Sequence, residues 1–199
     1  MTALFIAVLH YNIPAISSLL QNHADDIIQD NNGNTALIFA CSLYNDYEMI
    51  NLLLNNPYTI NMSNKDGKTP FLSITFTDER IIDLLCSKGA NVQDTDINGN
   101  NALHLAIVSK KSTQKANQNI LLKLLSLGLD INAKNNAGET AIFLAFKHYE
   151  YEKAKVLAQN NADFSIETNK GLTITSISNG SIYAKTVLDN YYFAKNSKK

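Results

Sequence analysis

Five glycines recur along this chain at nearly constant spacing, each after a short polar run. They are Gly33, Gly67, Gly99, Gly138 and Gly171, and successive members lie 34, 32, 39 and 33 residues apart. Two residues after each glycine comes Thr or Asn, followed by an apolar run with helical spacing. A repeat of about this length is one supersecondary unit that cannot bury its apolar face alone. The spacing therefore predicts a stack of similar helical repeats.

The start of each repeat contains a turn signal and a helix signal. Asp or Asn before the glycine favours a tight hairpin, because glycine tolerates positive φ. Pro70 has the fixed φ that suits the first turn of a helix. The residues suited to cap the first helix through their hydroxyls are Thr35, Thr69, Thr140 and Thr173.

The second half of each repeat is also apolar. Leu-Leu pairs at 53/54, 84/85 and 124/125 predict the buried face of a second helix. Gly89 and Gly128 follow two of these stretches and are suited to a left-handed helix C-cap. Each repeat is therefore expected to contain two helices.

This period and these motifs resemble the ankyrin repeat, whose pattern is Asp-x-x-Gly-x-Thr-Pro-Leu-His-x-Ala followed by Leu-Leu-x-x-Gly-Ala-Asp. The resemblance covers about residues 2–190. It implies an all-α repeat solenoid of stacked helix-turn-helix units joined by β-hairpin-like loops. Only His104 occupies the family's histidine position, where the resemblance implies that it braces neighbouring hairpin loops.

The repeat boundaries predict a single domain over residues 1–193, with about six repeats and a flexible tail at 194–199. The outer repeats are atypical and are expected to act as caps. The repeats are 2–29 (N-terminal cap), 30–62, 63–94, 95–133, 134–166 and 167–193 (C-terminal cap).

The fourth repeat is longer than the others because of a polar insertion at 109–119, which contains three lysines. One interpretation is a solvated loop or a helix extension that adds solubility. The other is a contact loop for an acidic partner or an anionic surface.

Composition excludes several classes of protein. Lys and Arg number 17 against 18 Asp and Glu, a net charge of −1, which argues against a basic nucleic-acid binder. Cys41 and Cys86 are the two cysteines, too few for a disulfide scaffold, and both lie in apolar helical patterns. We expect reduced, inert core thiols.

The sequence contains no motif for catalysis, nucleotide binding or metal binding. It has no phosphate-binding glycine loop, dinucleotide fingerprint, zinc-protease motif, nucleophile elbow or Cys-x-x-Cys pair. Its histidines, His10, His23, His104 and His148, fall in four different repeats. We therefore expect a protein that is not an enzyme and needs no cofactor or metal.

The apolar opening, residues 1–9, is expected to be a buried helix. No basic residue precedes the apolar run, so it does not read as a signal peptide, and it is too short to cross a membrane. The expected location is cytoplasmic, or the host cytosol if the protein is exported.

The resemblance implies a protein–protein interaction scaffold that grips another protein, with no nucleic acid or membrane as partner. Contacts are expected at the hairpin tips and at the ends of the first helices. Phe76 and Ile97 carry most weight, because exposed apolar side chains there would need a reason. Asparagine also belongs in turns for backbone reasons, so the tips have a purely structural interpretation too. The expected contact residues are Asn31, Asn32, Asn34, Lys65, Asp66, Lys68, Phe76, Ile97, Asn98, Asn100, Asn136, Glu139, Lys147 and His148.

Alternative roles remain open. If Phe5, Val8 and Leu9 are exposed, the N-terminal cap could form a homodimer. A regulatory subunit of an enzyme complex is another alternative. The abundance of Asn, Ile, Lys and Tyr is typical of AT-rich genomes, which suggests a host-directed effector of an intracellular bacterium or virus.

Two further asparagines, Asn61 and Asn132, occupy the position that a host asparaginyl hydroxylase modifies in the family that this chain resembles. Their default role is to brace the turn.

Overall fold

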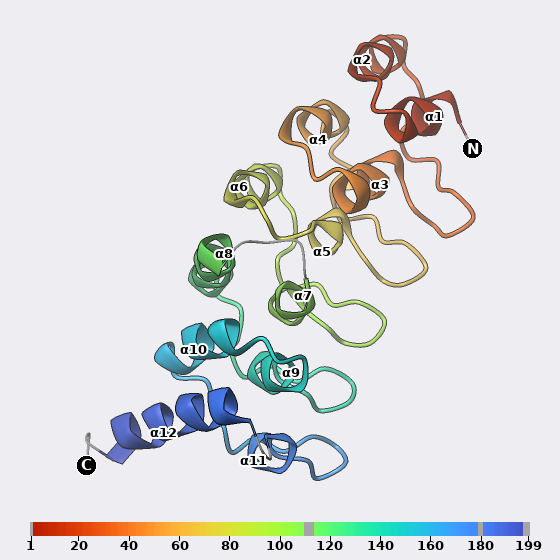
Figure 1. Ribbon diagram of the computed structural model, residues 1–199. Coiled ribbons are helices and arrows are strands. Elements are labelled where there is room, and N and C mark those ends of the chain that lie inside the picture. Colours follow the sequence, from red (N-terminus) through yellow and green to blue (C-terminus); the bar gives the residue numbers. More distant parts are fainter. Residues whose placement is uncertain (1, 110–113, 179–180, 197–199) are drawn as a thin grey trace. The chain divides into compact units, whose positions relative to one another are not determined.

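The computed structural model describes residues 2–109, 114–178 and 181–196 (Figure 1). The internal contacts of the chain divide it into two compact units. The N-terminal unit is Met1–Ile97 and the C-terminal unit is Asn98–Lys199. Every predicted repeat contains one pair of helices. The grouping of all six repeats into one domain over 1–193 stays a prediction.

The N-terminal unit is built from three helix pairs. The first helices of the pairs, α1, α3 and α5, contact one another in order, and α2, α4 and α6 form a second layer in the same order. The elements are α1 (Ala3–Leu9), α2 (Ile13–Gln21), α3 (Ala36–Leu43), α4 (Tyr47–Leu53), the 3-10 turn η1 (Thr59–Asn61), α5 (Pro70–Ser73) and α6 (Glu79–Ser87).

The C-terminal unit repeats this arrangement. Helix α9 contacts both α7 and α11, and α10 contacts both α8 and α12. The elements are α7 (Ala102–Val108), α8 (Gln114–Ser126), α9 (Ala141–Lys147), α10 (Tyr151–Gln159), α11 (Ile174–Ile177) and α12 (Ile182–Asn196). The described residues contain no strand, only an isolated antiparallel bridge between Lys134 and Thr140. The predicted all-α repeat solenoid class is confirmed.

The helix caps lie where the sequence predicts them. Thr35 Oγ1 accepts a hydrogen bond from the Ile38 amide at 3.2 Å, and Thr140 Oγ1 accepts one from Phe143 at 3.3 Å. Thr69 and Thr173 cap α5 and α11 in the same way. These bonds satisfy amides at the start of the helix that have no partner within it.

The hairpin loops within each unit are joined by backbone hydrogen bonds. The amide of Lys65 donates to the carbonyl of Asn32 at 2.9 Å, and the amide of Asn169 donates to the carbonyl of Ala137 at 3.0 Å. The loops approach so closely that a Cβ on Gly138 would lie 2.6 Å from the Asn169 nitrogen. Glycine is therefore required there by the neighbouring loop as well as by its positive φ.

A buried lysine interrupts the apolar pattern of the second helices. Lys153 stands where the equivalent helices have Met49, Ile81 and Ile120, and only 2% of it is exposed. Its ammonium group donates to the carbonyl oxygens of Ala106, Ile107 and Ser109. These acceptors are at the end of α7, so Lys153 completes the C-terminus of that helix.

Two groups of apolar residues differ from expectation. Phe76 is only 3% exposed, so the prediction that it is an exposed contact is wrong. Helix α5 has just four residues, and after it the chain turns Phe76 into the core with φ of 52°. Phe5 and Val8 are also buried, because α1 packs them against α2 and α3. At the N-terminal cap, Leu9 is exposed, so it alone of the three residues meets the condition for a homodimer contact.

Three further predictions concern the cysteines, the C-terminal tail and the insertion. Cys41 is buried, but Cys86 is partly exposed and is not a core thiol. Residues 194–196 continue α12, 197–199 lie outside the described residues, and the flexible tail stays a prediction. In the insertion, 114–119 belong to α8, which agrees with a helix extension, and 110–113 lie outside the described residues.

Candidate functional site

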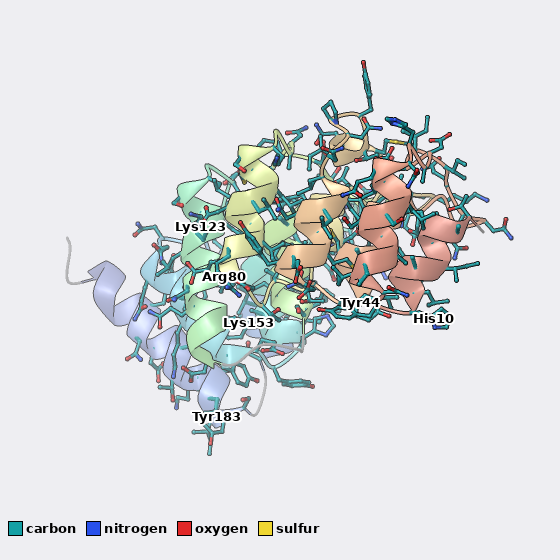
Figure 2. The ribbon with its side chains drawn as sticks, turned by 90° about the horizontal axis from the view of Figure 1, so that it is seen from above. His10, Tyr44, Arg80, Lys123, Lys153 and Tyr183 are labelled. Carbon is teal, nitrogen blue, oxygen red and sulfur yellow. The ribbon has the colours of Figure 1, made fainter. Side chains whose placement is uncertain are left out.

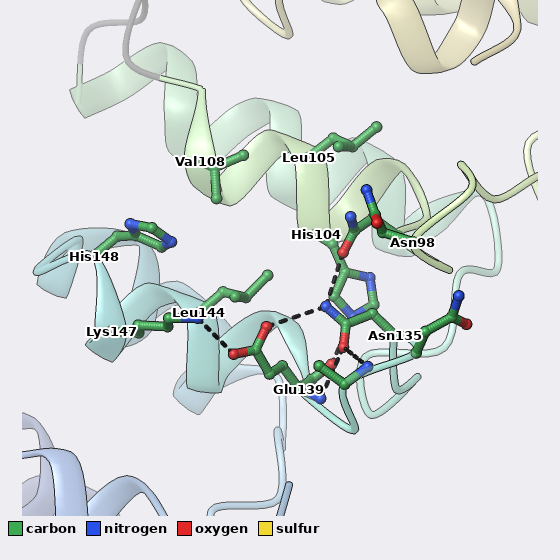
Figure 3. Close-up of a pocket in the computed structure, with 12 residues that line it drawn as sticks. Asn98, His104, Leu105, Val108, Asn135, Glu139, Leu144, Lys147 and His148 are labelled. Atoms are coloured by element: carbon green, nitrogen blue, oxygen red, sulfur yellow. Dashed lines mark hydrogen bonds and ion pairs between the residues drawn. The ribbon is translucent and has the colours of Figure 1, made fainter. Parts of the chain in front are cut away.

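An open pocket of about 530 Å³ lies in the C-terminal unit, between the hairpin loops that precede α7 and α9 (Figure 3). We call it the hairpin pocket. Six of the predicted contact residues line it: Asn98, Asn100, Asn136, Glu139, Lys147 and His148. The remaining lining residues are His104, Leu105, Val108, Asn135, Ala137 and Leu144.

The first helices supply the apolar part of the pocket. Leu105 and Val108 come from α7, and Leu144 comes from α9. Val108 is exposed, whereas Leu144 is almost covered by its neighbours. The hairpin loops add amide side chains to this apolar surface, so the pocket offers the mixed chemistry of a typical protein-binding surface.

His104 fixes the wall of the pocket. Its ring lies on α7, is 1% exposed, and has Nδ1 2.7 Å from Asn101 Oδ1 and Nε2 3.1 Å from the carbonyl oxygen of Glu139. Asn101 Oδ1 also accepts from the Leu103 and His104 amides as the cap of α7. The ring thus joins the start of α7 to the next hairpin loop, which confirms the predicted bracing role.

An ion pair joins two of the residues that line the pocket. Lys147 Nζ lies 2.7 Å from Glu139 Oε1, and Figure 3 shows the two side chains facing each other. Burial raises the pKa of Glu139, but hydrogen bonds from Lys147 and Asn135 and the nearby positive charges outweigh it. The pKa of Glu139 therefore lies below its ordinary value, and the carboxylate stays charged at neutral pH.

A set of bracing residues at the hairpins was not singled out from the sequence. Asp30 Oδ1 accepts from the amides of Asn32 and Asn34, and Asn64 Oδ1 and Asn135 Oδ1 make the equivalent bonds in their own loops. The sequence signal for these bracing residues is an Asp or Asn three residues before a recurring hairpin glycine. Such side chains stabilise the turn by mimicking its backbone hydrogen bonds.

The same bonds separate the predicted contact residues into two kinds. Asn34 Oδ1 accepts from Asn64, and Asn100 Oδ1 accepts from Asn135, so both asparagines take part in bracing. In the N-terminal unit, Lys68 is half-buried, whereas the residues at the tips of the hairpin loops are exposed, and 64% of Ile97 is exposed. The exposed tip residues of that unit are Asn31, Asn32, Lys65, Asp66 and Ile97.

The two asparagines considered for hydroxylation both brace turns. Asn61 Nδ2 donates to the carbonyl of Gly89, and Asn61 Oδ1 accepts from the Asn91 amide at 2.8 Å. Asn132 Oδ1 accepts from the Asp163 amide at 2.8 Å. Their modification stays a prediction.

Two other kinds of site were sought in the described part of the chain. It contains no group of three or more His, Cys, Asp or Glu side chains that could hold a metal ion. None of the helices described there is long and apolar enough to cross a bilayer.

Comparison with known proteins gives consistent matches. Residues 19–71 match a model of ankyrin repeats in many copies, and residues 98–136 match the single ankyrin repeat. A putative ankyrin repeat protein of Acanthamoeba polyphaga mimivirus is 25% identical over 82% of this chain and 21% of its own length. One of fowlpox virus is 27% identical over 79% of this chain and 47% of its own length.

The similarity extends to animal proteins. Human neurogenic locus notch homolog protein 1 is 32% identical over 72% of this chain, which is 5% of that protein. The chain thus spans less than half the length of each of these relatives.

Proposed function

Because this chain belongs to the ankyrin-repeat family, we propose that it is a non-catalytic scaffold that binds a partner protein through the hairpin pocket. Ankyrin repeats generally mediate protein–protein interaction, and the family is typically non-catalytic. The observation that carries the proposal is the convergence of six predicted contact residues on one pocket with an apolar floor.

The chemistry of the pocket suits the binding of a short segment of the partner protein. Val108 and Leu105 form a surface for one apolar side chain, since burying apolar area at the centre of an interface supplies most of its affinity. Asn98 and Asn136 bring amide groups to the rim, His148 brings an imidazole ring, and Lys147 brings an ammonium group that Glu139 partly balances. This rim suits peptide carbonyls and a carboxylate.

The viral relatives support a version in which the partner is a host protein. The mimivirus and fowlpox relatives are both named putative ankyrin repeat proteins, and both belong to viruses. A host-directed effector is therefore the specific form of scaffold that we propose.

The alternative of self-association through the N-terminal cap has some support. Ile6 and Leu9 are exposed on α1, next to an apolar hollow that Ala3, Ala7 and Leu19 help to line. Light scattering at several concentrations tests it, because a monomeric mass throughout contradicts a homodimer.

The test of the pocket compares the wild type with a triple variant of the pocket and with a double variant that serves as the control. Val108→Ser, Lys147→Ala and His148→Ala change the pocket. Leu122→Ser and Lys155→Ala make comparable changes on the second helices, where Lys155 pairs with Glu152 much as Lys147 pairs with Glu139. Quantitative affinity capture from host lysate should recover a protein with wild type and control but not with the pocket variant. Equal recovery by the pocket variant contradicts the proposal.

A further inference from the structure

In the N-terminal unit, the loops that join paired helices and the helix ends beside them expose a row of aromatic and apolar side chains. Tyr11, Tyr44 and Tyr47 are 46%, 36% and 42% exposed, and Leu9 and Leu43 flank them. We call these five residues the tyrosine edge. Tyrosine is enriched at protein interfaces because it offers large contact area with few rotatable bonds.

The rings are held in place by contacts within the unit. Those of Tyr11 and Tyr44 meet edge to face with centroids 5.2 Å apart, and the Tyr44 hydroxyl donates to the Leu9 carbonyl. Asn45 Nδ2 donates to Thr77 Oγ1 at 3.1 Å, which joins the loop before α4 to the loop before α6. In Figure 2 the side chains of His10, Tyr44 and Arg80 lie along one side of this unit.

The charge around the edge is negative. Asp46 and Glu48 start α4, and Asp78 and Glu79 start α6. The hydrogen bond to Asp46 is the main cause that raises the pKa of Tyr11. Over the whole N-terminal unit, 11 Asp and Glu stand against 4 Lys and Arg, so the near-neutral charge of the chain conceals a strongly acidic half.

The structure contains an example of the contact that this surface can make. The Arg80 guanidinium lies 5.8 Å from the centre of the Tyr47 ring and 2.6 Å from Asp78 Oδ2. A tyrosine face and a carboxylate therefore hold one guanidinium together at the surface. Arginine favours this combination because its planar group stacks on rings and still donates hydrogen bonds.

We propose that the tyrosine edge binds an extended, arginine-containing segment of a partner protein. Guanidinium groups of the partner stack on Tyr11, on Tyr44 and on the part of the Tyr47 ring that Arg80 leaves exposed, and Glu48 and Glu79 balance their charge. Charge complementarity selects this occupant, since an acidic surface repels nucleic acid and anionic membranes. The edge lies outside the hairpin pocket, so this proposal stands or fails independently of the proposed function.

The test is fluorescence anisotropy with three labelled 12-residue peptides that alternate glycine with arginine, lysine or glutamine. The arginine peptide should bind the full-length protein more tightly than the lysine peptide, and the glutamine peptide should not bind. Tyr47→Leu removes a ring and keeps the apolar bulk, and it should weaken the arginine peptide about fivefold. Tyr58→Leu is the control, since Tyr58 is 80% exposed in the same unit but away from these loops.

A second pair of variants separates the edge from the general charge of the unit. Glu48→Gln with Glu79→Gln should weaken binding more than Asp66→Asn with Asp83→Asn, although both pairs change the net charge equally. Circular dichroism checks that each variant is folded, and the charge variants test the proposal even if Tyr47→Leu does not fold. The proposal is overturned if Tyr47→Leu weakens binding of the arginine peptide no more than Tyr58→Leu does. It is also overturned if the Glu48 and Glu79 variant weakens binding no more than the Asp66 and Asp83 variant does. Salt-sensitive dimerisation that excludes the arginine peptide also overturns it, because a second copy would then cover the edge.

Discussion

The ammonium nitrogen of Lys153 lies 2.8 Å from the carbonyl oxygen of Ile107, and this contact fastens α10 to the end of α7. Two more carbonyls from the same turn share the ammonium group. Burial lowers the pKa of Lys153, and the Glu150 carboxylate at 3.6 Å offsets part of this effect. A buried charge is therefore retained because it donates hydrogen bonds to carbonyls at a largely buried helix end.

Lys153→Met should destabilise the protein by about 1–3 kcal/mol, because the carbonyls at the end of α7 lose their donor while the apolar stem is preserved. Urea unfolding followed by circular dichroism measures the change. Lys155→Met on the same helix is the control and should cost less than about 0.5 kcal/mol. A loss for Lys153→Met no larger than that of the control would show that the carbonyls find other partners.

Glu139→Gln should lower stability at neutral pH by about 1 kcal/mol, and its effect should shrink as the pH falls through the folded-state pKa of Glu139. The folded state lowers the pKa of Glu139. Its stabilising contribution is therefore present above the pKa of the unfolded chain and disappears as the pH falls through the folded value. Urea unfolding of both proteins at several pH values measures the difference, and a difference that does not depend on pH contradicts the ion-pair explanation.

Gly138→Ala should destabilise the protein more than Gly171→Ala. Both glycines have positive φ, of 76° and 69°, so each alanine costs about 1–2 kcal/mol in backbone strain. At Gly138 the new Cβ would also meet the Asn169 nitrogen at 2.6 Å, whereas at Gly171 it would meet no atom within 4 Å. Thermal unfolding of the two variants compares them directly, and equal losses would mean that the hairpin loops separate easily.

Cys41 should not react with a thiol reagent in the native protein, whereas Cys86 should. Cys41 is fully buried, and burial raises the pKa of its thiol, so little thiolate forms. Titration with an aromatic disulfide should give about one fast thiol in buffer and two in denaturant. Cys86→Ser should remove the fast reaction, and a fast reaction that persists in this variant would show that Cys41 is accessible.

Features that depend on a few neighbouring residues followed from the sequence. The caps at Thr35 and Thr140, the positive φ of Gly138 and the bracing ring of His104 all lie where the repeat pattern places them. These features are local or recur at the repeat period, so one sequence suffices to locate them. The same regularity predicts six of the residues that line the hairpin pocket.

Burial and pairing were decided by the tertiary structure. The shortened α5 turns Phe76 inward, and the open end of α7 recruits Lys153 from a helix more than 40 residues away. In both cases the partner comes from a different part of the chain, so the residue's own neighbours in sequence carry no signal for it. A repeat pattern thus determines which elements form and in what order, whereas the environment of a side chain exists only after those elements have packed together.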